Sequence, residues 1–187
     1  MSLNSNSNIA EIIRNRRAVK KGYNDKTVEE QTIRDLLEDA VWAPTHGMRQ
    51  PWRFVFIPHE EIPAFAKKVA DTYPEEKQEN REEYMNEPNA ILAVIMEEPE
   101  IQKQWEENYG ATASMIQNLW LLAWEQNLGM VWKTNPHIYE PEVQQELNVQ
   151  ENEKLVGLVH LGYFDRQPIR KHRISVDDKF STYNSGE

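Results

Sequence analysis

The longest helical pattern of this chain is apolar on nearly every side. It runs from about Gln102 to Gln126, and its centre, residues 110–124, reads GATASMIQNLWLLAW. A helix without a polar face has to be buried, either inside a domain or at an obligate interface between subunits. Both interpretations stay open here. Because the chain has 187 residues, we expect one domain with a sizeable core around this helix.

Short apolar runs predict four strands, near residues 54–57, 90–96, 130–132 and 155–161. A capping box formed by Thr27 and Glu30 predicts a helix that ends near Pro44, and Asn8 with Glu11 predicts an earlier helix start. Since strands and helices alternate irregularly, the pattern favours an α+β fold over a doubly wound sheet.

The two ends of the chain differ from its middle. Residues 1–7 are rich in Ser and Asn and are expected to form a disordered tail, which leaves residues 8–187 as a single domain. After Asp165 the sequence has no amphipathic period and is expected to be a C-terminal extension. The charged stretch 60–84 is predicted to be helical, and its acidic part after Pro74 reads as a solvated helix or a lid.

Composition excludes several kinds of protein. There is no cysteine, so a disulfide scaffold, a zinc–thiolate site and a thiol nucleophile are ruled out. The net charge of −10 disfavours nucleic acid and anionic membranes as partners. No secretory signal and no membrane-spanning run is visible, so we expect a cytoplasmic protein. The five histidines have no metal-site spacing, and no GxGxxG, P-loop or GxSxG motif occurs.

Three segments could carry chemistry. Residues 14–21 hold five positive charges and no negative one, and residues 170–173 form a second basic cluster. Such clusters suit a phosphate-bearing ligand, although solvated surface charge is the alternative. The loop 42–52 contains two prolines, and the segment 127–134 follows the long helix. Each segment is interpreted either as a ligand-binding loop or as an ordinary connection.

Taken together, these segments resemble the nitroreductase family of flavin-dependent oxidoreductases. Arg16-Arg17-Ala18-Val19-Lys20 is similar to the family's R-R-S-x-R/K. Ala43-Pro44-Thr45-His46 leading to Gln50-Pro51-Trp52 is similar to its A-P-S-x-x-N-x-Q-P-W. Leu128-Gly129 with Trp132-Lys133-Thr134 resembles the small single-domain branch, and the resemblance spans residues 8–175.

The resemblance implies a three-layer α+β fold, with a mixed, mostly antiparallel sheet flanked by helices, and an intertwined homodimer with FMN at each of two interface sites. It places Arg16 and Arg17 at the FMN phosphate and ribityl chain, beside Ala18, and Lys20 at the pyrimidine edge of the ring. It also implies cofactor contacts by further residues: Pro44, Thr45 and His46 from the other subunit, and Trp132, Lys133, Thr134, Lys171 and Arg173.

The implied activity is reduction of nitroaromatics, quinones or related small acceptors by NAD(P)H, in a ping-pong sequence. The flavin supplies the hydride chemistry, so no catalytic side chain is expected. A flavin-binding or flavin-processing protein without reductase activity is the alternative, and an anion-binding module without flavin is a third. Two departures from the family bear on the substrate: Ala18 replaces the usual Ser, and Met48 stands where many members have Asn.

Overall fold

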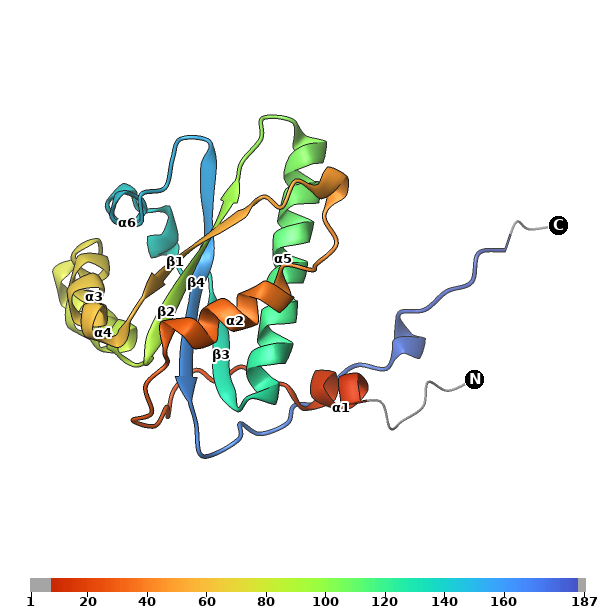
Figure 1. Cartoon of the computed structure of the whole chain (residues 1–187), viewed down its shortest axis with the longest axis horizontal. Helices are drawn as coiled ribbons and strands as arrows, with labels where there is room; N and C mark the ends of the chain where they lie inside the picture. Colours follow the sequence, from red (N-terminus) through yellow and green to blue (C-terminus); the bar gives the residue numbers. More distant parts are fainter. Residues whose placement is uncertain (1–7, 185–187) are drawn as a thin grey trace.

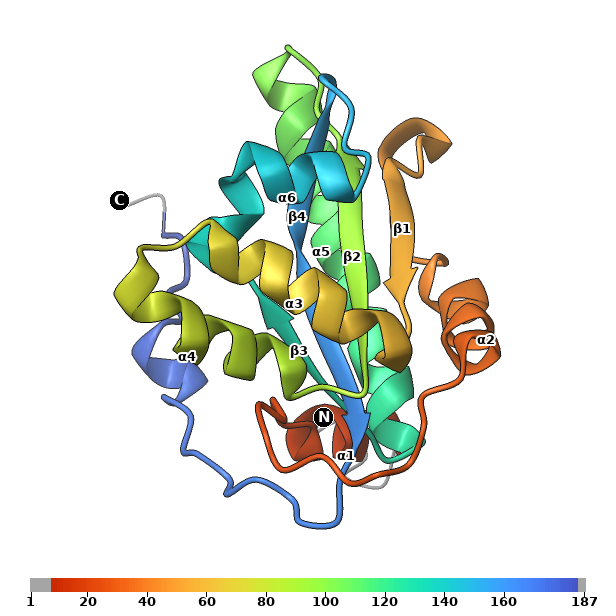
Figure 2. The same ribbon diagram turned by 90° about the vertical axis from the view of Figure 1, so that its left-hand side faces the viewer.

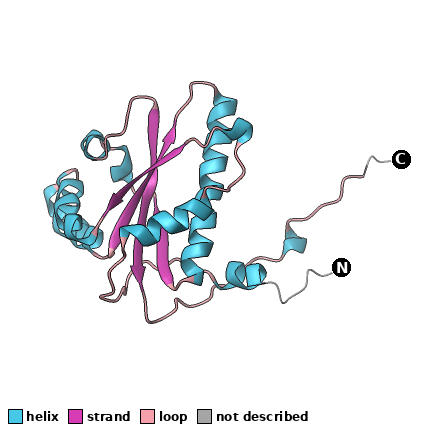
Figure 3. Ribbon diagram, in the orientation of Figure 1, coloured by secondary structure: helices cyan, strands magenta, loops and turns pink. Residues whose placement is uncertain are grey.

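A four-stranded sheet forms the middle of the molecule (Figure 3), in a computed structural model that describes residues 8–184. The predicted tail, residues 1–7, lies outside the described residues. The strands are β1 (Trp52–Ile57), β2 (Ala90–Glu97), β3 (Leu128–Lys133) and β4 (Glu153–Tyr163), in the order β1-β2-β4-β3. All three strand pairs are antiparallel. Each apolar run expected to be a strand is one.

Helices cover both faces of this sheet (Figures 1 and 2). One face carries α2 (Glu30–Ala40) and α5 (Gln102–Glu125); the other carries α3 (Ile62–Asp71), α4 (Glu75–Asn86) and α6 (Pro141–Glu146). Two separate clusters of buried side chains fill the spaces between the layers. Because β2 and β4 are covered on both sides, almost all of their residues are buried. The expected three-layer α+β fold is confirmed.

The four strands of the sheet pair antiparallel throughout, and the one parallel pairing among residues 8–184 is an isolated bridge at the edge of β3. Ala18 forms a parallel bridge with Met130, and the Val19 N–H donates to the Met130 carbonyl at 3.2 Å. This bridge follows the short helix α1 (Asn8–Asn15), which packs against α5. It places the basic segment after α1 along the outer edge of β3, so sequence positions far apart meet there.

The long helix α5 is buried on one side only within the chain. Met115, Leu119 and Ala123 are fully buried against the sheet and α2, whereas Gly110 and Gln117 are exposed. Its Asn118 side chain also donates to the Ala40 carbonyl of α2 at 3.2 Å. The chain alone therefore does not cover the apolar helix on every side.

One predicted helix start is wrong. The capping box at Thr27 predicts that α2 begins there, but α2 begins at Glu30, and its N-cap Glu29 makes no side-chain capping bond. Val28 is 3% exposed and belongs to the core. The chain has to stay extended through Glu29 to bury Val28, which leaves Thr27 exposed and outside the first helical turn.

The segment after Asp165 runs away from the rest of the chain (Figure 1). It is exposed along nearly its whole described length and contains one short 3₁₀ turn, Val176–Asp178. Five of its large apolar side chains are exposed: Ile169, Ile174, Val176, Phe180 and Tyr183. Within residues 8–184, no helix is long and apolar enough to cross a bilayer.

Candidate functional site

Arg16 places a half-buried cation over an aromatic ring. The guanidinium carbon lies 4.2 Å from the centre of the Trp120 ring, and the Nε atom is buried without a hydrogen-bond partner. Burial lowers the pKa of Arg16, and the positive charges of Arg173 and Arg17 lower it further. A cation that is partly desolvated and repelled by its neighbours is stabilised by a bound anion.

The other residues of the basic segment lie beside Arg16. Arg17 turns back, and its Nη1 donates to the carbonyl oxygens of Arg14 and Arg16, at 2.7 Å each. Ala18 lies in the bridge to β3 and is half-buried, while Lys20 is exposed. The structure thus brings these predicted site residues together at one edge of the sheet.

The second basic cluster reaches the same place from the other end of the chain. Lys171 and Arg173 are both exposed in the C-terminal segment. Arg173 lies near enough to Arg16 for its charge to lower the pKa of that guanidinium. Cations from both ends of the sequence therefore meet close to Trp120.

The loop of residues 44–50 has an unusual backbone. Three of its residues have positive φ angles: Gly47 (59°), Met48 (54°) and Gln50 (47°). A left-handed conformation costs a residue with a side chain roughly 1–2 kcal/mol. The Thr45 Oγ1 accepts a hydrogen bond from the Gln50 N–H at 3.1 Å, which spans the turn. Such a conformation persists only where surrounding contacts hold it, and loops of this kind cluster at functional sites.

A groove of about 580 Å³ opens beside this loop. Two of its large apolar side chains are strongly exposed, Trp42 at 85% and Met48 at 74%. Of the predicted site residues, Pro44 and Thr45 line the groove, and His46 is exposed next to them. The remaining lining residues are Glu38, Val41, Ala43 and Gln50.

The loop and the basic cluster lie at different ends of α5 (Figure 1). The loop contacts the helix at Glu107 and Asn108, whereas Arg16 contacts it at Trp120. At 1.5 Å per residue, the helix rises about 18 Å from Asn108 to Trp120. One chain therefore does not bring Arg16 and His46 together.

Trp132 lies flat over its neighbouring strand. Its Nε1 donates to the Val156 carbonyl at 3.2 Å, and Val156 is the extra residue of a β-bulge in β4. Gly157 makes this packing possible, since a Cβ atom there would lie 2.3 Å from the Trp132 Nε1. The ring belongs to the face of the sheet that carries α2 and α5.

Lys133 points to the opposite face of the sheet. Its Nζ lies 4.6 Å from the centre of the Tyr84 ring of α4, and burial lowers its pKa. The fully buried His160 lies near Lys133, and His137, also fully buried, lies near His160; each histidine has an Nε2 atom without a partner. The structure does not bring the Lys133 side chain to the Arg16 cluster, and Thr134 is exposed after the end of β3.

Two parts of this arrangement escape sequence reasoning. Trp120 reads as a core residue of the apolar helix, and nothing marks it as the ring under Arg16. Arg49, which anchors the loop to Glu107 and Asn108, is far from both in sequence, and an Asn within a helix carries no signal of burial. Within residues 8–184, no three His, Asp or Glu residues are grouped in a way that could hold a metal ion.

Comparison with known proteins identifies the chain. The family model described as "Nitroreductase family" matches residues 13–163. The chain belongs to the nitroreductase family. As a nitroreductase-family member, it is an oxidoreductase. The matched residues include the basic segment 14–21, the loop 44–50 and β3.

Relatives of similar length support this membership. The protein "Putative NAD(P)H nitroreductase YfhC" of Bacillus subtilis (strain 168) is 35% identical over 96% of both chains. A crystal structure of a nitroreductase-like family protein from Bacillus cereus has a TM-score of 0.89 at 32% identity, covering 98% of this chain and 100% of that one. The structure described as "a putative nitroreductase in complex with fmn", from Desulfovibrio desulfuricans, shares the fold with a TM-score of 0.77 at 18% identity, over 97% of this chain and 100% of its own.

Proposed function

We propose that the protein is an FMN-dependent oxidoreductase that uses NAD(P)H to reduce small aromatic acceptors such as nitroaromatics and quinones. The observation that carries the proposal is the half-buried guanidinium of Arg16 on Trp120, whose buried Nε has no hydrogen-bond partner and which lies near the charges of Arg17 and Arg173. A phosphate group supplies the acceptors that this cluster lacks. The names of the relatives, NAD(P)H nitroreductase and a nitroreductase with FMN, support the same activity.

The residues of the basic cluster fit the phosphate end of such a cofactor. Arg16 offers its free Nε, Arg173 reaches the same place from the C-terminal segment, and Lys171 adds a charge nearby. We assign Lys20 to the pyrimidine edge of the flavin ring, and we assign Trp132 to a contact with the same ring. Bound FMN would supply hydride transfer from NAD(P)H to the acceptor, with the two substrates using the site in turn.

The site we propose is completed by a second copy of the chain. Arg16 and the loop residues Pro44, Thr45 and His46 lie at different ends of α5, so the loop that faces one cofactor has to come from a partner. Exposed apolar residues support a large interface, because a chain alone would leave them in water: Ile9, Ile13, Trp42, Ile169, Ile174, Val176, Phe180 and Tyr183. A twofold dimer would bury them and produce two equivalent sites.

The protein's own contribution is then binding, orientation and exclusion of water. The cations would neutralise the phosphate of FMN, and the partner subunit would shield the flavin ring from solvent. No side-chain nucleophile or metal ion takes part in the proposal.

Substitution of Arg16 tests the assignment of the phosphate site. Arg16→Ala should reduce retained FMN about ten-fold or more, since hydrogen bonds to charged groups contribute about 1.5–3 kcal/mol each. Arg81→Ala is a matched control: Arg81 also has a buried, partnerless Nε and lies over aromatic rings, but it is on α4. Retained FMN is measured by absorbance after gel filtration. Equal retention in the two variants would contradict the assignment.

The purified protein should also lose its yellow colour when NADH or NADPH is added without oxygen. Bound FMN that neither nucleotide reduces would instead indicate a flavin-binding or flavin-processing protein. A colourless protein that takes up no added FMN would exclude both.

A further inference from the structure

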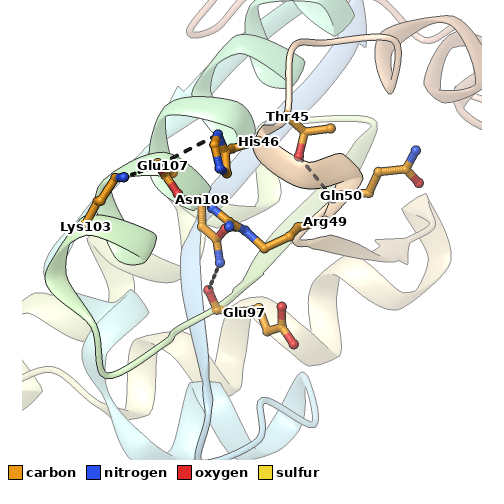
Figure 4. A network of polar contacts seen from close by, with 8 residues as sticks. All are labelled: Thr45, His46, Arg49, Gln50, Glu97, Lys103, Glu107 and Asn108. Carbon is orange, nitrogen blue, oxygen red and sulfur yellow. Dashed lines mark hydrogen bonds and ion pairs between the residues drawn. The ribbon is translucent and has the colours of Figure 1, made fainter.

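A partly buried ionic network fixes the middle of the loop 44–50 to helix α5 (Figure 4). The Arg49 Nη2 pairs with the Glu107 carboxylate at 2.5 Å, and the Arg49 Nε donates to the Asn108 side-chain oxygen at 3.0 Å. Both partners lie on the same stretch of α5. Two different N–H groups of one guanidinium thus donate to two consecutive helix residues, which fixes the orientation of the Arg49 side chain as well as its position.

The acceptor Asn108 is itself held in place. It is 2% exposed, and its Nδ2 donates to the Glu97 carbonyl at the end of β2, at 3.2 Å. The buried Asn108 side chain is thus hydrogen-bonded at both its oxygen and its nitrogen, and moving it would break both bonds.

Glu107 connects the two ends of the turn. Its carboxylate pairs with Arg49, lies 3.9 Å from the His46 Nδ1 and 3.8 Å from the Lys103 Nζ. The Arg49 hydrogen bond lowers the pKa of Glu107, so the carboxylate stays ionised at neutral pH. Since His46 precedes and Arg49 follows the left-handed pair Gly47 and Met48, this one carboxylate faces both sides of that pair (Figure 4).

The anchored side chain determines where its neighbours lie. Arg49 is half-buried and points at α5, while Met48 and Gln50, on either side of it, have positive φ and are exposed. Met48 lines the groove beside Trp42. The contacts of Arg49 with α5 therefore keep Met48 and Gln50 in the left-handed conformation, which neither residue favours on its own.

We propose that Arg49 is a positioning residue: with Glu107 and Asn108 it clamps the loop 44–50 so that Thr45, His46 and Met48 are held ready to face the cofactor bound by a second copy of the chain. This inference rests on the proposed function. It adds an element that binds no cofactor itself and acts by keeping a strained loop in its binding shape.

A matched control for this clamp exists in the same chain. Arg53 of β1 also pairs with a carboxylate, donating through Nε and Nη2 to Glu153 of β4. Its exposure and that of Glu153, 35% and 15%, are close to the 28% and 22% of Arg49 and Glu107. Replacing either arginine by Met removes a similar ion pair, but only Arg49→Met releases the loop.

The first test reads the loop without cofactor. Hydrogen exchange of the backbone amides of residues 45–50 is measured in the wild type, Arg49→Met, Arg49→Lys and Arg53→Met. We expect exchange in Arg49→Met to be about ten-fold faster or more, because local opening no longer breaks a charged hydrogen bond. Arg49→Lys should lie between, and Arg53→Met should match the wild type. Wild-type exchange in Arg49→Met would overturn the clamp.

The second test titrates FMN into the apoproteins. The Kd of Arg49→Met should rise about ten-fold, whereas Arg53→Met keeps the wild-type Kd even where its Tm falls as far. An unchanged Kd in Arg49→Met, or an equal rise in both variants, would overturn the positioning role. If the wild type binds no FMN, the proposed function fails, and the exchange measurement alone decides whether the clamp exists.

Discussion

At the residue scale, the backbone at Met48 explains the family's preference. Its φ of 54° lies in the left-handed region, where Asn is several-fold enriched over other residues with a side chain. The motif A-P-S-x-x-N-x-Q-P-W carries Asn at this position, so the residue is suited to the turn as well as to any ligand. Met48 neither favours the left-handed conformation nor offers a side-chain amide to a ligand. The contacts of Arg49 compensate for the free-energy cost of the left-handed backbone.

Met48→Asn should therefore stabilise the protein by about 0.5–1 kcal/mol, the difference that left-handed preference makes. In a chain of this length, a gain of that size raises Tm by roughly 1–4 °C. Met48→Gln is the control, since it is equally polar but has no left-handed preference. Thermal unfolding compares the three proteins, and an equal gain in both variants would assign the effect to polarity.

At this scale, only the family resemblance assigns the cations of residues 14–21 and 170–173 to one ligand, and that assignment stays a prediction. The contacts of Arg16 with Trp120 and of Arg49 with Glu107 depend on tertiary packing, and no pattern in the sequence indicates them.

At the element scale, the strands could be predicted and the connections between them could not. Unbroken apolar runs mark β2 and β4 because helices bury both of their faces. No sequence pattern predicts the helix α6, since only Val143 of its six residues is buried and no period is visible. The sheet order could not be read either, because it depends on which face each helix covers.

Two histidines are buried in neighbouring elements, His160 in β4 and His137 in the 3₁₀ turn Pro136–Tyr139. Burial lowers the pKa of His160 to about 3 and that of His137 to about 4, and the charges of Lys133 and Arg81 act in the same direction. In the unfolded chain both side chains titrate near their ordinary pKa of about 6.5. The unfolded state thus binds more protons below pH 6.5, so stability must fall as the pH decreases.

We expect the free energy of unfolding to decline from about pH 6.5 downwards, by on the order of 3 kcal/mol for each of the two histidines near pH 4. Paired carboxylates such as Glu107 add to the loss only below about pH 4.5, where they are protonated in the unfolded state. Urea unfolding between pH 7 and 5 isolates the histidines. His160→Gln should flatten this slope, and the exposed His59→Gln should leave it unchanged. A slope unaffected by His160→Gln would contradict the assignment.

At the scale of the whole molecule, the two parts of the site we propose lie apart in one chain. The basic cluster lies at one end of α5, and the clamped loop lies at the other end (Figure 1). The exposed apolar side chains of the C-terminal segment and the uncovered side of α5 both favour association with a second copy. In a twofold dimer, each site would take its cations from one copy and its loop from the other.

Mixing two defective variants tests this composite site most directly. Arg16→Ala removes the cation, and His46→Glu places a negative charge on the loop. Each variant alone should retain little FMN. After the two are unfolded and refolded together, half of the dimers are mixed and each has one intact site, so FMN binding should return to about a quarter of the wild-type level. No recovery on mixing, with both variants correctly folded, would contradict a site shared between two chains.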